Sequence, residues 1–251
     1  MSHYYEKNAY TDEQITRMQL TDSPTIVVDD FISQDEVYEL RTIIDTIEYP
    51  EHGKTSKYSG SAYEHEPHGP RIKEILDNKL EKVLGSYNLD FFCWQEAIKP
   101  WKIHADLRWY ADKIPHKLIL VPLAVIDDQS SWADTYTLTF KQRNYLRYYG
   151  KKDFPQESKY GNNDSKEWLR PIDHPNVEGC VEGYSIDKQT WSEYLSHMPY
   201  EHVEGLEIDQ IYKWNSGSAI AWDADQLHCA DNFLARNIKT KLSMVIHTYQ
   251  D

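Results

Sequence analysis

The sequence contains little cysteine. Its 251 residues include only three, Cys93, Cys180 and Cys229, and these are scattered along the chain. A disulfide framework needs an even number of cysteines at short, recurring spacings. We therefore expect a protein of a reducing compartment, the cytoplasm, whose stability comes from a hydrophobic core.

Long apolar runs are also missing. No segment approaches the roughly 20 consecutive apolar residues that a membrane-spanning helix requires. Residues 1–21 are polar and acidic, without the basic start and apolar centre of a secretory signal. We expect no membrane contact, and we interpret residues 1–21 as a loosely tied N-terminal arm.

Positive charge is scarce. The 27 Lys and Arg residues are outnumbered by 41 Asp and Glu residues, which gives a formal net charge of −14 at pH 7. Such a surface would on average repel a phosphate backbone. The basic stretch at residues 141–152 interleaves with tyrosines and is interpreted as a solvated hairpin, so no nucleic-acid partner is expected.

Aromatic residues, in contrast, are plentiful. Phe, Trp and Tyr make up 13% of the chain, with 19 Tyr and 8 Trp. These large side chains can fill a core. The chain length fits one large domain, and we assign residues 22–251 to it.

Two helices are predicted in the first third of the chain. Residues 25–31 form a β-branched run that is typical of a buried strand. Ser33 and Glu36 then match the S-x-x-E capping box, and apolar residues continue at helical spacing. A second amphipathic helix is predicted after Pro70, with Gly85 as its C-cap.

The remainder of the chain is dominated by strand patterns. Residues 141–206 are predicted to form a polar insertion with one helix at residues 188–195. Helices followed by many strands predict an α+β, mainly β domain in which the N-terminal helices support a β-sandwich. The predicted strands lie at residues 89–98, 116–126, 136–140, 208–214, 218–222 and 239–249.

A His-x-Asp pair, His104 and Asp106, lies between two of these strands. Residues i and i+2 of an extended chain point the same way, so the imidazole and the carboxylate would face one point together. Non-haem Fe(II) oxygenases bind their metal with two histidines and one carboxylate and leave the other positions open. A histidine from a distant strand would complete this set.

The short motif is weak by itself, because chance gives about two matches in a chain of this composition. The other match here is His202-x-Glu204. It lies in a loop bounded by Pro199 and Gly205, and too close to the best distal histidine for the chain to cross a sandwich and return. We interpret His202 as a surface residue.

The distal histidine is His228, which follows a turn, a strand and a short loop. Thirteen residues later, Lys241 and Ser243 share one face of an apolar strand and could bind a carboxylate together. An unpaired ammonium is costly to bury, so Lys241 is expected to have a carboxylate partner, either a cosubstrate or a protein aspartate.

This ordered set of motifs resembles the 2-oxoglutarate/Fe(II)-dependent dioxygenase family, in its prolyl-hydroxylase-like and phytanoyl-hydroxylase-like branch. The resemblance spans roughly residues 24–249. The motifs that carry it are the strand and helix at residues 26–36, the His-x-Asp pair, the Gly217 strand that leads to His228, and Lys241-x-Ser243.

The resemblance implies a double-stranded β-helix, which is a cupin-like jelly roll, and a hydroxylase reaction. Fe(II) would be held by His104, Asp106 and His228. Lys241 and Ser243 would hold 2-oxoglutarate, which is oxidised by O2 to succinate while a substrate C–H bond is oxidised. Family members that halogenate have a small residue in place of the aspartate, so Asp106 implies hydroxylation. The family's commoner anchor is arginine, so Arg236 stays as an alternative to Lys241.

The substrate is expected to be a small molecule or a protein side chain. Trp101, Arg108 and Trp109 flank the His-x-Asp pair and are candidates to contact it. Two other interpretations stay open. One is a cupin-like metalloenzyme that does not use 2-oxoglutarate, and the other is a non-catalytic jelly-roll binding module.

Overall fold

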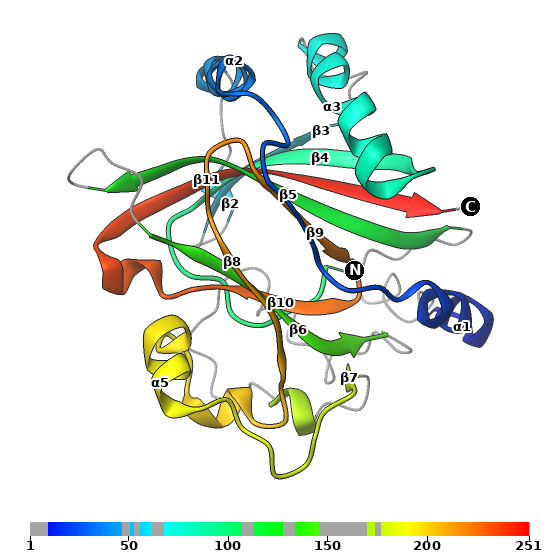
Figure 1. Cartoon of the computed structure of the whole chain (residues 1–251), viewed down its shortest axis with the longest axis vertical. Helices are drawn as coiled ribbons and strands as arrows, with labels where there is room; N and C mark the ends of the chain where they lie inside the picture. Colours follow the sequence, from blue (N-terminus) through cyan, green and yellow to red (C-terminus); the bar gives the residue numbers. More distant parts are fainter. Residues whose placement is uncertain are drawn as a thin grey trace.

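The computed structural model describes residues 10–46, 51–52, 56–61, 68–106, 113–127, 134–145, 170–173 and 177–250 (Figure 1). Helices in this part are α1 (Asp12–Thr21), α2 (Gln34–Asp45), α3 (Gly69–Leu84) and α5 (Lys188–Thr190), which continues into the π-helical turn η3 (Trp191–Leu195). Short 3-10 turns are η2 (Pro171–Asp173), η4 (Tyr200–Val203) and η5 (Phe233–Arg236). Its strands are β1 (Ile26–Val28), β2 (Glu51–His52), β3 (Ser56–Ser61), β4 (Asn88–Ala97), β5 (Ile114–Asp127), β6 (Tyr136–Asn144), β7 (Val177–Glu178), β8 (Ile208–Lys213), β9 (Ala219–Asp223), β10 (Gln226–Ala230) and β11 (Ile238–Gln250).

The strands form two antiparallel sheets. The larger sheet has the order β1-β9-β5-β11-β4-β3-β2. In the smaller sheet β6 pairs with β10, β7 and β8. Figure 1 shows α2 and α3 on the outer side of the larger sheet and α5 beyond the smaller one.

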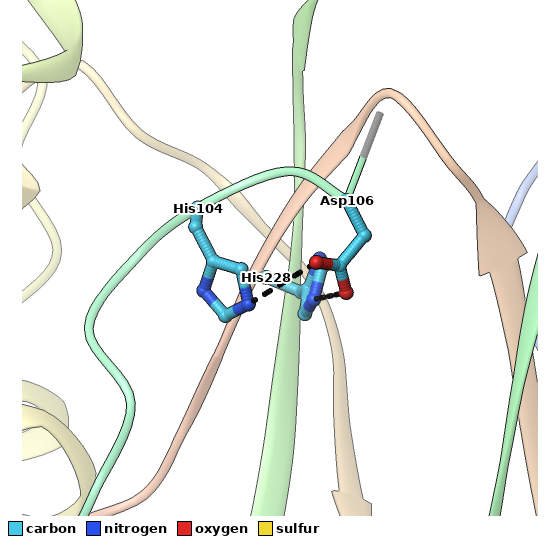
Figure 2. Close-up of side chains that lie close together, drawn as sticks. All are labelled: His104, Asp106 and His228. Carbon is cyan, nitrogen blue, oxygen red and sulfur yellow. Dashed lines mark ion pairs between the residues drawn. The ribbon is translucent and has the colours of Figure 1, made fainter. Parts of the chain in front are cut away.

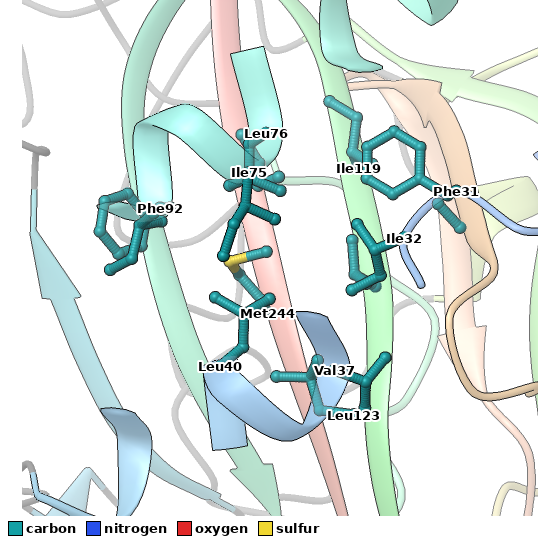
Figure 3. Packing of buried hydrophobic residues seen from close by; sticks show 14 of the residues in the cluster. Phe31, Ile32, Val37, Leu40, Ile75, Leu76, Phe92, Ile119, Leu123 and Met244 are labelled. Carbon is teal, nitrogen blue, oxygen red and sulfur yellow. The ribbon is translucent and has the colours of Figure 1, made fainter. Parts of the chain in front are cut away.

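Side chains alternate across the larger sheet and divide the core into two layers. Phe92, Ile119 and Met244 face outward and pack against α2 and α3 (Figure 3). Trp94 belongs to the same cluster. Their neighbours along the strands face the smaller sheet, where they meet Trp214 of the chain after β8. These inward residues include Phe91, Cys93, Leu118, Leu120, Ile220, Trp222 and Val245. The second layer is the interior of the sandwich, and it holds the candidate functional residues.

The smaller sheet has an apolar outer face as well. Leu138, Phe140 and Cys229 point away from the interior and pack against Leu195 and Val203 of the segment between β7 and β8. The predicted insertion therefore contributes a core layer in its described part. Its predicted helix at residues 188–195 is confirmed as α5 with η3.

The predicted helix starts and stops are confirmed where the sequence is most explicit. Ser33 caps α2 through a complete capping box with Glu36. Gly85 follows α3 with φ of +70°, a conformation that glycine adopts at no steric cost. In the described part of the chain, no helix has the length and hydropathy to cross a membrane.

Several elements were not foreseen. Helix α1 lies in the expected arm, where Thr11 and Gln14 form a capping box and Ile15 and Met18 are buried. Strands β2 and β3 occupy a stretch expected to be a loop, and β10 is a strand where only a short loop was predicted. These strands are short or polar, so their alternation is weak, and β3 and β10 are determined by pairing with β4 and β6, which are more distant in sequence.

We expect Gly217→Ala to lower the free energy of unfolding by about 3 kcal/mol, because two costs combine. Gly217 has φ of +82°, and an added Cβ would lie 2.5 Å from the Ile32 carbonyl oxygen. Gly183→Ala is the matched control, since Gly183 has φ of +76° and open space around its Cα. It should lose only about 1 kcal/mol in urea unfolding, from the backbone conformation alone. Equal losses would contradict the close packing of Gly217 on the start of α2.

Candidate metal centre

Backbone pairing brings the two predicted histidines together. The His104 N–H donates to the His228 carbonyl at 3.0 Å, and the His228 N–H donates to the His104 carbonyl at 2.9 Å. The segment that contains the His-x-Asp pair thus lies beside β10 as one antiparallel bridge. A third backbone hydrogen bond lies beside these two, in which the Asp106 N–H donates to the Ala224 carbonyl at 3.1 Å. Positions more than 110 residues apart are joined by three backbone hydrogen bonds.

The three side chains point toward one another (Figure 2). His228 Nε2 lies 3.3 Å from Asp106 Oδ2, and His104 Nε2 lies 3.9 Å from Asp106 Oδ1. One candidate ligand atom from each residue fits within 4.8 Å of the others. The side chains of His104, Asp106 and His228 are 8%, 13% and 6% exposed, so the group is nearly enclosed by protein.

The backbone also determines which ring nitrogen is turned toward Asp106. His104 Nδ1 lies 2.6 Å from the Lys102 carbonyl, and His228 Nδ1 lies 3.0 Å from the Gln226 carbonyl. A carbonyl oxygen can only accept, so both Nδ1 atoms carry the proton in the neutral rings. The lone pair is then on Nε2, which is the arrangement found in metal-binding histidines.

This donor set fits a divalent transition metal. In non-haem Fe(II) sites, two imidazole nitrogens and one carboxylate oxygen occupy one face of the metal and leave the opposite face for other ligands. The bonds from both Nδ1 atoms to carbonyls supply the outer hydrogen bonds that such sites need. The residues present therefore suit Fe(II).

Two tryptophans flank the histidines. The Trp101 ring lies 5.3 Å from the His104 ring, and the Trp222 ring lies 4.7 Å from the His228 ring, measured between centroids. Both indole Nε1 atoms are buried and have no hydrogen-bond partner among the described residues. A buried N–H without an acceptor is unfavourable, so both are suited to donate to a bound ligand.

Lys241 lies inside the sandwich, where its side chain is 2% exposed. Its Nζ donates to the Tyr136 carbonyl at 2.8 Å, lies 3.4 Å from Asp231 Oδ1 and sits 3.9 Å above the Trp214 ring. Burial lowers the pKa of Lys241 to about 8, and Asp231 opposes that change. Of the two partners considered from the sequence, the structure thus contains a protein aspartate.

Ser243 and Arg236 are the other two residues expected to bind 2-oxoglutarate, and their surroundings differ from each other. Ser243 is 2% exposed and follows Lys241 on the same face of β11. The Arg236 guanidinium is 26% exposed and stacks at 5.1 Å on the Tyr136 ring, which belongs to the outer face of the smaller sheet. Its Nε lies 3.4 Å from Asp231 Oδ2. Arg236 therefore approaches the same carboxylate as Lys241, but from the outside.

A second carboxylate group, Asp22, Asp223 and Asp225, is also compact enough to hold a metal. Protein cations already occupy it: Arg143 Nη1 lies 2.8 Å from Asp223 and 2.7 Å from Asp225, and Lys117 pairs with Asp223. Burial raises the pKa of Asp225 to about 7. We interpret this group as a buried ion network that fixes the turn before β10.

Some expected residues were not brought to the centre, and other residues were missed. Arg108 and Trp109 lie outside the described residues. His202 lies half-buried in η4, and Glu204 pairs with Arg170 at 2.5 Å. Asp231 and Trp222 were not predicted as site residues. Asp231 follows His228 by three positions, but a lone aspartate there carries no sequence signal, since aspartate is usually exposed.

We expect His228→Ala to weaken Fe(II) binding by about 100-fold or more, because losing even an outer hydrogen bond of a metal ligand costs 10- to 100-fold. Anaerobic competition with a chromophoric chelator would measure the affinity. His202→Ala, which removes the histidine of the other His-x-acid pair, should leave it unchanged. A similar loss in both variants would contradict the assignment of the ligands.

No protein-family model and no curated protein matches the sequence. Solved structures do match the fold along nearly the whole chain. One is a non-haem α-ketoglutarate-dependent carbocyclase, SnoK, from nogalamycin biosynthesis, with 9% identity and a TM-score of 0.50, covering 96% of this chain and 84% of that one. Another is an oxidoreductase of the 2OG-Fe(II) oxygenase family from Burkholderia pseudomallei, with 10% identity and a TM-score of 0.50, covering 96% and 92%. The expected fold class is thereby confirmed: this chain has the double-stranded β-helix fold of the 2-oxoglutarate/Fe(II)-dependent oxygenases, with supporting N-terminal helices.

Proposed function

We propose that this chain belongs to the 2-oxoglutarate/Fe(II)-dependent oxygenases and that it hydroxylates its substrate. The observation that carries the proposal is the placement of His104, Asp106 and His228 around one point inside this fold (Figure 2). Bound Fe(II) and 2-oxoglutarate would supply the oxidation by O2 that releases succinate and CO2 and oxidises a substrate C–H bond. Asp106 supports hydroxylation, because its carboxylate takes the position that a halide would need.

The protein's own part in this chemistry is to hold the metal ligands in place and to enclose the site. The carbonyls of Lys102 and Gln226 orient the two imidazoles through Nδ1, so that each Nε2 is held ready before a metal arrives. Aromatic and aliphatic side chains fill the sandwich interior around them. Such surroundings exclude water and strengthen the electrostatic interactions inside.

Lys241 is proposed to bind the distal carboxylate of 2-oxoglutarate, with Ser243 beside it. Its buried ammonium shares the sandwich interior with the candidate metal ligands: it packs on Trp214, and Trp214 lies in the same apolar layer as Trp222, which contacts His228. A buried ammonium attracts a carboxylate more strongly than an exposed one does.

The substrate is proposed to be a small molecule that carries hydrogen-bond acceptors. Trp101 supports this, because its indole N–H is buried beside His104 without a partner among the described residues. We further propose that residues 22–251 act as one catalytic domain in the cytoplasm. The free thiols of Cys93, Cys180 and Cys229 support a reducing compartment.

The cupin-like alternative differs from our proposal because it requires no binding of 2-oxoglutarate. Because Asp231 already pairs with Lys241, the buried lysine has a structural task even without a cosubstrate. Anaerobic addition of Fe(II) and then 2-oxoglutarate tests the two functions directly. Our proposal requires a visible charge-transfer band that needs both additions, whereas folded, iron-loaded protein without such a band would favour the alternative.

Lys241→Gln should weaken 2-oxoglutarate binding by about 10- to 100-fold, which corresponds to the 1.5–3 kcal/mol of a hydrogen bond to a charged group. Titration of the charge-transfer band measures the change. Lys239→Gln is the matched control, since it removes a positive charge from an exposed position of the same strand. Binding that is weakened equally by both substitutions would show a general charge effect instead of an anchor.

A further inference from the structure

Asp231 is a buried carboxylate that accepts from two donors and faces a second cation. Its side chain is 0% exposed. Oδ1 accepts from the Thr135 hydroxyl at 2.7 Å and faces Lys241 Nζ at 3.4 Å, while Oδ2 lies 3.4 Å from Arg236 Nε. A fully buried charge is unfavourable unless it is paired, so this arrangement has a physical requirement for both cations.

The cluster holds two cations and two carboxylates. Asp231 lies between Lys241 and Arg236, and Glu193 Oε1 approaches Arg236 Nη2 at 3.9 Å from the more exposed side. Arg236 is partly exposed on the outer side, while Lys241 is buried inside with its ammonium on the Trp214 ring. Arg236 therefore has a second carboxylate on its outer side, whereas on the inner side Asp231 is the carboxylate that faces the Lys241 ammonium.

We propose that Asp231 is a positioning residue for 2-oxoglutarate: it keeps the Lys241 ammonium charged and in place to receive the cosubstrate's distal carboxylate, while Arg236 holds Asp231 from the outer side. This inference rests on the proposed function. It also means that Lys241 and Arg236 are not alternative anchors, because both act on one carboxylate from opposite sides.

The surroundings explain why such a residue is needed. Charged and titratable groups that lie near Lys241 in the described part are Asp231, His197 after η3, Cys229 of β10, and Arg236 with its outer partner Glu193. Burial lowers the pKa of His197 to about 4 and raises that of Cys229, so both are neutral near pH 7. Asp231 is then the negative charge that opposes the loss of the Lys241 proton.

The test is the affinity for 2-oxoglutarate across pH, measured anaerobically with the Fe(II)-loaded full chain. Wild-type affinity should be nearly constant up to about pH 8, the pKa of Lys241. In Asp231→Asn the ammonium loses its counter-ion and its proton at lower pH, so the affinity should fall about tenfold or more near pH 8 and recover on acidification to about pH 6. Adding Lys241→Arg should remove this pH dependence, since guanidinium stays charged.

Tighter binding by Asp231→Asn, without pH dependence, would overturn the proposal and show that Asp231 competes with the cosubstrate for Lys241. Should the variant not fold, carbon-13 NMR of lysine Cε in the metal-free wild type decides instead. One lysine signal, absent from Lys241→Arg, should titrate near pH 8. A Lys241 signal that titrates well below pH 7 would also overturn the proposal, because the side chain would then be neutral in spite of Asp231. A wild type with no charge-transfer band would refute the proposed function itself. If the wild type shows the band and Asp231→Asn binds 2-oxoglutarate as the wild type does, only the role of Asp231 is refuted.

Discussion

The reciprocal pair of backbone hydrogen bonds between His104 and His228 is the interaction on which the candidate centre depends. It places an irregular segment after β4 against β10 and thereby fixes the separation of the two imidazoles. Because these hydrogen bonds join main-chain atoms, they connect the two segments without using a side chain. Each imidazole can then use Nδ1 for orientation and turn Nε2 toward Asp106.

A second constraint is the burial of charge next to an apolar interior. The turn from Asp223 to Asp225, just before β10, is held by Arg143 and Lys117, and its Ala224 carbonyl accepts from Asp106. Beyond the other end of β10, Asp231 joins Lys241 and Arg236. The strand that carries His228 is thus flanked at both ends by buried ion networks. Removing one partner of such a buried pair is strongly destabilising, so the partners at both ends hold β10 in place.

Much of the site was predictable because its signals are local. The spacing of His104 and Asp106, the turn before β9 and the helical capping box at Ser33 follow from steric and hydrogen-bonding rules that act over a few residues. The structure brings His104, Asp106 and His228 together as the sequence led us to expect. The strand-rich pattern after Gly85 also predicted the fold class correctly.

The rest depends on partners that are distant in the chain. Strand β10 is defined by its pairing with β6, and β3 by its pairing with β4, so their own sequences carry little signal. Aspartate is usually exposed, yet Asp231 is the most buried charge near the site. A sequence pattern indicates that Lys241 needs a counter-ion, but only the fold shows which residue provides it.

The most direct test of the central claim is a crystal structure grown anaerobically with Fe(II) and 2-oxoglutarate, using the anomalous signal of iron. Our account predicts one iron peak bound by Nε2 of His104, Nε2 of His228 and the Asp106 carboxylate, with the distal carboxylate of 2-oxoglutarate at the Lys241 ammonium. Iron among Asp22, Asp223 and Asp225, or 2-oxoglutarate bound away from Lys241, would contradict it.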